Sequence, residues 1–174
     1  MSQVLHSDGP HPDRQRVCVR CAVLTISDTR TPETDRSGPL MRDRLEGAGH
    51  EVVHASILKD NPAEIAHEVQ QLCQHPGIDA VLLSGGTGIA PRDTTYDAIV
   101  QLLDKTLPGF GELFRQLSFA EIGSRAIASR AIAGVCHGKL VFSLPGSSKA
   151  VTLALDALIL PELVHLVTLL RSPL

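Results

Sequence analysis

The sequence predicts a single α/β domain whose central sheet is mostly parallel and includes one antiparallel strand. Apolar runs typical of strands alternate with amphipathic helical patterns from residue 17 onward, as in parallel sheets that are covered by helices. At 174 residues the chain can bury a core on both sides of one sheet. We therefore expect one domain over residues 17–174. Residues 1–16 are polar, contain Pro10 and Pro12 and show no periodicity, so a flexible tail is expected there.

Four apolar runs predict the main strands, at Val17–Ile26, Val52–Leu58, Ala80–Ser84 and Leu140–Leu144. A hairpin that closes on His137-Gly138 precedes the last of them, which makes one strand antiparallel. Helical patterns follow the first three strands, and their expected N-caps are Ser37, Asn61 and either Thr94 or Thr95.

The C-terminal half contains more helix. Leu107-Pro108-Gly109 is expected to end the helix that follows the third strand, and residues 110–131 predict further helix with a break near Gly123. A last helix is expected from Lys149 towards Leu160, where Pro161 kinks or restarts it. Its broad leucine-rich stripe predicts core packing or, as the alternative, an oligomer contact.

The composition excludes several kinds of partner. Aromatic residues make up 3% of the chain, with no Trp and one Tyr, so no platform for base stacking is expected and nucleic acid is not a predicted partner. The net charge of −3 implies that any anion is bound by local geometry rather than by a general positive field. With no uninterrupted apolar stretch of about 20 residues and no signal peptide, we expect a cytoplasmic protein without a membrane association.

The cysteines and histidines do not predict a metal site. In a cytoplasmic protein the four cysteines are expected to be reduced. Cys18 and Cys21 resemble a metal or redox pair, but their odd spacing on a strand sends the two side chains to opposite faces. The histidines show no ligand spacing on one element, so solvated or hydrogen-bonded roles are expected for them.

A glycine-rich loop after the third strand is the strongest indication of function. Gly85, Gly86 and Gly88 allow positive φ and a close approach of the backbone to a ligand, and such a turn can direct N–H groups at a phosphate. The spacing fits neither a Walker A loop nor a dinucleotide fingerprint. Asp93 follows five residues after Gly88, and an acid so placed beside a phosphate indicates Mg²⁺ and phosphoryl or nucleotidyl chemistry. The alternative is a tight turn with a solvated aspartate.

Four segments at the exits of predicted strands are expected to converge, because ligands bind at the carboxyl ends of strands in open α/β sheets. They are Ser27-Asp28, Lys59-Asp60, Gly85 to Asp93, and Pro145 to Ser148. The first three supply carboxylates, which are hard ligands for a cation. Taken singly, Asp60 is more typical of a solvated turn residue and Ser27 of a hydroxyl bonded to the backbone, and Ser147 and Ser148 are typical helix caps.

Several motifs in one order resemble the MoaB/MogA family of molybdenum-cofactor biosynthesis over about residues 17–171. They are Thr25-Ile-Ser-Asp28, Asp35-Arg-Ser-Gly38, Ser84-Gly-Gly-Thr-Gly-Ile-Ala-Pro-Arg-Asp93, Pro108-Gly-Phe-Gly111 and Ser143-Leu-Pro-Gly-Ser147. The resemblance implies a three-layer α/β/α domain that assembles as a homotrimer or homohexamer. It also implies that the protein adenylylates molybdopterin, with Mg²⁺ as cofactor and with ATP and molybdopterin as substrates.

The same resemblance assigns roles to individual residues. Asp93 is expected to be catalytic through Mg²⁺, and Asp60 matches a second catalytic acid. Residues expected to bind substrate are Ser27, Asp28, Ser37, Gly85, Gly86, Thr87, Gly88, Pro145, Gly146 and Ser147.

Placement within the family depends on two segments. Gly111 to Gly123 is more similar to the MoaB branch, whereas Ala90-Pro-Arg-Asp93 agrees with active adenylyltransferases. Tyr96 departs from a proline that is common after the threonine of this motif. The alternative to an enzyme is a non-catalytic protein that binds or carries molybdopterin, and a more remote one is an unrelated phosphate-binding α/β enzyme.

Overall fold

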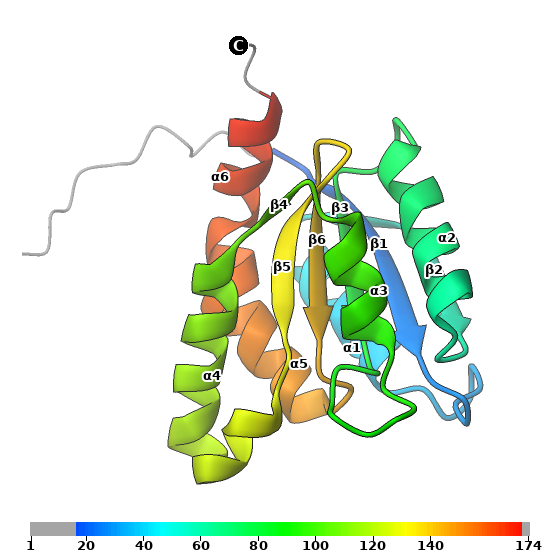
Figure 1. Ribbon diagram of the computed structural model, residues 1–174. Coiled ribbons are helices and arrows are strands. Elements are labelled where there is room, and N and C mark those ends of the chain that lie inside the picture. The colour runs from blue at the N-terminus through cyan, green and yellow to red at the C-terminus, as the bar shows by residue number, and fades with distance from the viewer. Residues whose placement is uncertain (1–16, 172–174) are drawn as a thin grey trace, which may run out of the picture.

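The computed structural model describes residues 17–171, and over this range it contains one six-stranded sheet with strand order β2-β1-β3-β6-β5-β4 (Figure 1). Strand β5 runs antiparallel to both of its neighbours, and β1, β2, β3 and β6 pair in parallel, which confirms the expected mixed sheet. The expected tail, residues 1–16, lies outside the described residues. The strands are β1 (Arg20–Ile26), β2 (Glu51–Leu58), β3 (Ala80–Ser84), β4 (Lys105–Thr106), β5 (Ile132–Cys136) and β6 (Lys139–Leu144).

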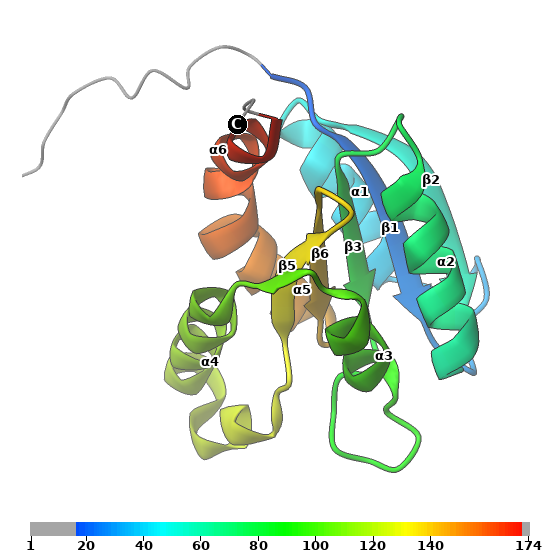
Figure 2. The ribbon, with the colours of Figure 1, turned by 45° about the horizontal axis from the view of Figure 1, so that its top comes forward.

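Helices cover both faces of the sheet and give the predicted three layers (Figure 2). One core lies between the sheet and α1, α4, α5 and α6, and the other lies between the sheet and α2 and α3. Central strands are buried on both faces, since all five residues of β3 are buried. The helices are α1 (Ser37–Gly47), α2 (Pro62–Gln74), α3 (Thr95–Leu102), α4 (Pro108–Ile122), the 3₁₀ turn η1 (Gly123–Ala128), α5 (Ser148–Ala154), the π turn η2 (Leu155–Ile159) and α6 (Leu160–Arg171).

Of the N-caps predicted for α1 and α2, the structure confirms the second and not the first. Asn61 caps α2 as expected, because its side chain accepts hydrogen bonds from the N–H groups of Ala63 and Glu64. The prediction of Ser37 as N-cap of α1 is wrong: Ser37 is the first residue of the helix, and Asp35 accepts the hydrogen bonds of its N–H and of Gly38. The carboxylate of Asp35, two residues before the helix, therefore accepts hydrogen bonds at the helix start, a role that the hydroxyl of Ser37 was expected to have.

Residues 107–109 do not end the helix that follows β3, contrary to the prediction. Instead α3 ends at Leu102, the short strand β4 follows, and Pro108 begins α4.

Gly123, with φ of 62°, ends α4 and starts η1, which confirms the break expected there. The hairpin of β5 and β6 closes on His137 and Gly138, both with positive φ, as predicted.

The last helical stretch, Ser148–Arg171, passes through the π turn η2, and regular α-helix restarts at Leu160, next to Pro161, in agreement with the restart expected there. Over the described residues it is also one helix whose length and hydropathy of 1.9 would suffice to cross a membrane. One side of it packs against the sheet, through Val151, Leu155, Ile159 and Leu163. Leu169 and Leu170 remain exposed.

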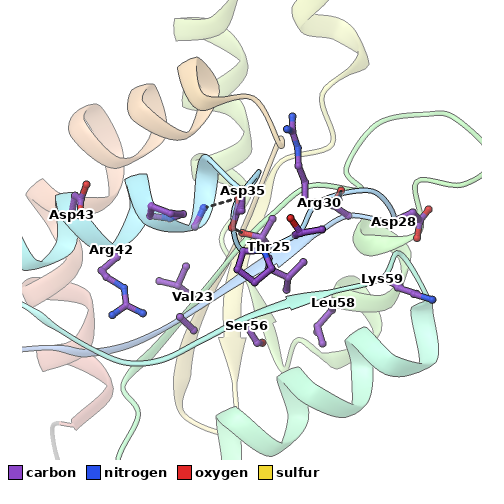
Figure 3. Close-up of a pocket in the computed structure, with 17 residues that line it drawn as sticks. Val23, Thr25, Asp28, Arg30, Asp35, Arg42, Asp43, Ser56, Leu58 and Lys59 are labelled. Carbon is purple, nitrogen blue, oxygen red and sulfur yellow. Dashed lines mark hydrogen bonds between the residues drawn. The ribbon is translucent and has the colours of Figure 1, made fainter.

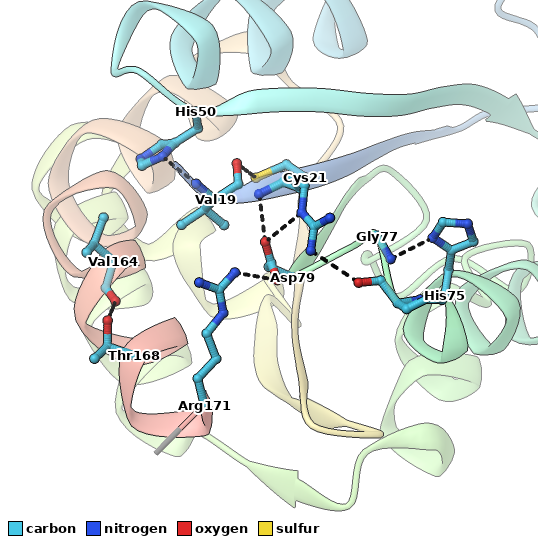
Figure 4. A network of polar contacts seen from close by, with 11 residues as sticks. Val19, Cys21, His50, His75, Gly77, Asp79, Val164, Thr168 and Arg171 are labelled. Atoms are coloured by element: carbon cyan, nitrogen blue, oxygen red, sulfur yellow. Dashed lines mark hydrogen bonds and ion pairs between the residues drawn. The ribbon is translucent and has the colours of Figure 1, made fainter. Parts of the chain in front are cut away.

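A buried carboxylate joins the chain ends of the domain at the amino-terminal edge of the sheet. Asp79, which is 6% exposed, accepts hydrogen bonds from the backbone N–H of Arg20 (2.9 Å) and pairs with Arg171 Nη2 (2.7 Å) (Figure 4). Burial alone would raise the pKa of Asp79. The hydrogen bonds and charges of Arg171 and Arg20 lower the pKa by more than burial raises it, so the net shift is downward. This network lies at the edge of the sheet opposite the carboxyl ends of the parallel strands.

The four cysteines are free; Cys18, which precedes β1, is exposed, and Cys21, Cys73 and Cys136 are buried. Burial raises the pKa of the Cys21 thiol to about 12, which keeps it protonated and unreactive at neutral pH.

Candidate functional site

The predicted convergence of four segments at the carboxyl ends of the strands is present in the structure. Gly85 N–H donates a 3.0 Å hydrogen bond to the carbonyl of Leu144, which joins the loop after β3 to the one after β6. A Cβ built on Gly146 would lie 3.2 Å from the Cα of Gly85, so these two loops are in close contact. The segments after β1 and β2 join them through a chain of hydrogen bonds.

That chain passes through two of the predicted acids. Asp28 Oδ1 accepts a hydrogen bond from the N–H of Asp60 (3.1 Å). Asp60 Oδ1 in turn accepts from both the N–H (3.1 Å) and the hydroxyl (2.7 Å) of Thr94, the residue at the N-cap of α3. The carboxylate of Asp60 thus does the capping that was expected of a threonine side chain, and it ties β1, β2 and α3 together.

The glycine loop needs its glycines for two different reasons. Gly85 and Gly86 have φ of 112° and 62°, a region that side chains other than glycine rarely adopt. A Cβ on Gly85 would also overlap the carbonyl oxygen of Ile26, and one on Gly86 would overlap Asp60 and Thr95. Gly88 does not have positive φ; a Cβ there would instead meet the carboxylate of Asp93. The expectation of positive φ is thus confirmed for two of the three.

This backbone leaves consecutive N–H groups without partners. Within residues 17–171, the N–H groups of Gly86, Thr87 and Gly88 form no hydrogen bond. Neighbouring N–H groups of this kind form concave sites that bind anions. Gly146 N–H and Ser147 N–H, on the facing loop, are likewise unpaired in the described chain.

Asp93 is folded back onto the loop. Its Oδ2 accepts a 2.9 Å hydrogen bond from the N–H of Ala90, while its own N–H donates to the Ala90 carbonyl. Its other carboxylate oxygen, Oδ1, forms no hydrogen bond with the described residues, and neither does Oδ2 of Asp60. Each acid therefore has one oxygen held by the protein and one oxygen free.

A cavity of about 340 Å³ lies between the glycine loop, the loop after β6, α4 and η1. It brings together most of the predicted substrate-binding residues. Those of them that line it are Gly85, Gly86, Thr87, Gly88, Pro145, Gly146 and Ser147, together with Asp93. Phe114, Ile122 and Ala126 provide an apolar wall, as is usual for a small-molecule site.

The other predicted residues lie on a different surface. Ser27 and Asp28 line a second cavity of about 650 Å³ between α1 and the edge strand β2 (Figure 3). Asp35 lines it too, and its Oδ2 accepts a 2.7 Å hydrogen bond from the hydroxyl of Thr25. Ser37 is buried, bonded to Asp35, and lines neither cavity. Ser27 and Asp28 thus reach the same edge of the sheet, where Asp28 bonds to Asp60, but Ser27, Asp28 and Ser37 do not line the cavity beside the glycine loop.

Arg130, which no sequence pattern indicated, organises the glycine loop. Its Nε donates to the carbonyl of Gly88 (2.9 Å), its Nη2 to the carbonyl of Asp93 (2.8 Å), and its Nη1 pairs with both carboxylate oxygens of Asp97. The guanidinium also lies 4.8 Å from the centre of the Tyr96 ring. Because Arg130 follows a 3₁₀ turn with no motif around it, no local pattern indicated this role.

The described residues form no complete metal cage. Within residues 17–171, no group of three or more His, Cys, Asp or Glu side chains is arranged to hold a metal ion. Mg²⁺ in nucleotide sites is usually held by one or two carboxylates together with phosphate oxygens and water. The free oxygen of Asp93, which lines the cavity, fits that mode, in which the nucleotide supplies part of the coordination; Asp60 lies beside Gly86 but lines neither cavity.

Comparison with known proteins identifies the family. Residues 22–165 match the family described as a probable molybdopterin binding domain. A protein of Halalkalibacterium halodurans named molybdenum cofactor biosynthesis protein B is 57% identical over 148 residues, which cover 84% of this chain and 87% of that protein.

Solved structures agree. A crystal structure of molybdenum cofactor biosynthesis protein B has a TM-score of 0.88 and 51% identity, and the match covers 90% of this chain and 98% of that one. The tungsten cofactor synthesizing protein MoaB from Pyrococcus furiosus has a TM-score of 0.80 and 36% identity, over 89% of this chain and 98% of that one. The cavity beside the glycine loop thus lies in the part of the chain that the family shares.

Proposed function

The chain belongs to the molybdopterin-binding-domain family that includes the molybdenum cofactor biosynthesis proteins B, and from this premise we propose that it transfers an adenylyl group from Mg-ATP to molybdopterin. The observation that carries the proposal is the run of unpaired N–H groups at Gly86, Thr87 and Gly88, three residues that line a cavity together with Asp93. Backbone N–H groups can bind phosphate oxygens, and a neighbouring carboxylate can bind the cation that accompanies the phosphate.

In the proposed reaction a phosphate oxygen of molybdopterin attacks the α-phosphorus of ATP. The new P–O bond forms as the bond to the β-phosphate breaks, and AMP-molybdopterin and pyrophosphate result. The protein has to bring two anions together, so its main task is to orient them and stabilise the charge that develops.

Different residues around the cavity bind the phosphates, bind the cation and exclude water. The N–H groups of the glycine loop bind phosphate oxygens, and the facing loop at Gly146 and Ser147 closes the other side of the cavity. Asp93 would hold Mg²⁺ through its free oxygen, and Asp60, the second proposed acid, fixes the start of α3 next to Gly86. When bound, the ion neutralises phosphate charge. The apolar wall at Phe114 and Ile122 excludes water from the reacting groups.

Molybdopterin and a nucleotide are the proposed partners, in the cytoplasm, and the proposed assembly is a homotrimer or homohexamer. Exposed apolar side chains support the assembly, because Phe119 and Ile127 are 62% and 88% exposed on the outside of α4 and η1, and Leu169 is 58% exposed on α6. Phe119 and Ile127 lie beside the same shallow cavity, and large exposed apolar side chains are typical of contacts between subunits.

The decisive test is to incubate the purified full chain with molybdopterin and Mg-ATP and to look for AMP-molybdopterin and pyrophosphate. Formation of both, dependent on Mg²⁺, supports the proposal. Tight binding of molybdopterin with no transfer would instead assign the non-catalytic carrier role, and the absence of binding would exclude both.

A further inference from the structure

Arg125 is the cationic side chain that lines the cavity beside the glycine loop; Asp93 is the acidic one, and the other lining residues carry no charge. Within the part of the chain that the structure describes, Arg125 forms no hydrogen bond or ion pair. We propose that the guanidinium of Arg125 binds a phosphate group of the ligand in this cavity. The inference rests on the proposed function, because it names the residue that recognises the anionic part of the substrates.

The backbone holds Arg125 at this position. Gly123, with φ of 62° and ψ of −146°, ends α4 and reverses the chain into the short turn η1. Ala126, the next residue after Arg125, is 4% exposed and fixes the turn against the core, and Ser129 N–H bonds to its carbonyl at 3.1 Å. Ala126 and Ala128 line the cavity as well, so the turn that carries Arg125 is part of its wall.

The charges of the cavity favour a phosphate contact with a cationic side chain of the protein. The N–H groups of Gly86 to Gly88 contribute dipoles but no full charge, and Asp93 adds a negative charge next to them. The net charge of the chain is −3, so no general positive field attracts a phosphate. An arginine is suited to the purpose, because its planar guanidinium binds two phosphate oxygens at once.

Two other arginines near the loop do not line this cavity. Arg130 uses its Nε, Nη1 and Nη2 on Gly88, Asp97 and Asp93, and the carboxylate of Asp97 balances its charge. The side chain of Arg115 lies next to Gly111 and lines two other cavities. Arg125 is therefore the arginine that lines the cavity with its donors still free.

The test is to measure binding of Mg-ATP, adenosine and molybdopterin to the wild-type full chain and to Arg125→Gln by calorimetry. We expect Arg125→Gln to weaken the binding of at least one phosphate-bearing ligand by about tenfold or more, the usual effect of losing a charged hydrogen bond. Binding of adenosine, which has no phosphate, should not change. Arg125→Lys should recover part of the loss, because it keeps the charge and loses the planar fork.

Arg115→Gln is the matched control, since it removes the same charge from the same region without touching this cavity. It should leave all three affinities within about twofold. Because Arg125 is exposed, its variants should melt within about 2 °C of the wild type, which shows that the fold is intact.

The two substrates give separable outcomes. Loss of affinity for Mg-ATP alone assigns Arg125 to a nucleotide phosphate, and loss for molybdopterin alone assigns it to the phosphate of the pterin; either supports the inference. Unchanged affinities of a wild type that binds both ligands overturn the inference and leave the proposed function standing. A wild type that binds neither ligand overturns the proposed function and this inference together.

Discussion

Arg130 Nη2 donates a 2.8 Å hydrogen bond to the backbone carbonyl of Asp93, so an arginine 37 residues further along the chain fixes the end of the loop that carries the acid. The same guanidinium bonds the carbonyl of Gly88, near the start of that loop. The conformation of the glycine loop therefore depends on a residue next to β5 as well as on its own glycines. Loop and arginine form one structural unit.

Replacing Arg130 with lysine should loosen this unit. Lysine keeps the positive charge but cannot bond two carbonyls and a carboxylate in one plane, so we expect a loss of about 1–3 kcal/mol in the free energy of unfolding. Amide hydrogen exchange of residues 85–95 should quicken more than that of the core strands. Arg44→Lys, at the exposed pair with Asp156, is the control and should cost less than about 0.5 kcal/mol. Equal exchange in the loop of wild type and variant would contradict the role of Arg130.

Asp93→Asn should separate catalysis from binding. Asparagine has the same shape and can still accept the hydrogen bond from Ala90 N–H, but it lacks the negative charge that would hold Mg²⁺. If Asp93 acts through Mg²⁺, adenylyl transfer should fall by roughly 100-fold or more while molybdopterin still binds. Glu46→Gln removes one negative charge from the exposed side of α1 and should leave transfer unchanged. Undiminished transfer by Asp93→Asn would show that this acid is a solvated turn residue.

Gly85→Ala should destabilise the domain strongly. The new Cβ would overlap the carbonyl oxygen of Ile26, and alanine rarely adopts the φ of 112° found there, so we expect a loss of more than about 2 kcal/mol in urea denaturation. Gly109→Ala is the matched control. Gly109 lies in α4 with no atom near the position of a Cβ, so this change should be neutral or stabilise the protein by up to about 1 kcal/mol. Equal stabilities of the two variants would refute the packing argument for Gly85.

The charged carboxylate of Asp79 should make the free energy of unfolding depend on pH. Its pKa in the folded protein is below the ordinary value of 3.8, so its charged form stabilises the fold. This contribution is fully present above the ordinary pKa and is lost as the pH falls through the lowered one. Asp79→Asn should therefore be less stable than the wild type at pH 7, and the difference should shrink below about pH 4. Urea denaturation at several pH values measures it.

Asp156, which forms an exposed ion pair with Arg44, provides the control variant for these urea denaturation measurements. Asp156→Asn should show a small difference from the wild type at every pH, since exposed pairs contribute little. A gap between wild type and Asp79→Asn that stays constant down to pH 3 would mean that Asp79 acts through its shape and not through its charge.

The proposed assembly has a direct measurement. Light scattering at micromolar concentration should give the mass of three or six chains of 18.6 kDa. Raising the salt concentration should not dissociate the assembly, because the exposed groups proposed to form the contacts, Phe119, Ile127 and Leu169, are apolar. A monomeric mass at this concentration would show that these side chains are simply exposed.

Local sequence determined the elements and the edge of the sheet where the site lies. The apolar run of β3 was predicted with its observed bounds, and the order of strands and helices placed the glycine loop and the Pro145 turn at carboxyl ends of strands. Gly85 and Gly86 have the positive φ that their sequence indicated. These features were predictable because periodicity, capping and backbone freedom act over a few neighbouring residues.

Tertiary structure decided which side chains the loop contacts. Arg130 and Arg125 lie far from the loop in sequence and in no motif, so only the path of the chain through α4 and η1 brings them to it. The motif around Ser27 and Asp28 is at the right edge of the sheet, yet it faces the α1 side and lines another cavity. Side-chain partners depend on distances between segments separated by tens of residues, and local patterns do not encode those distances.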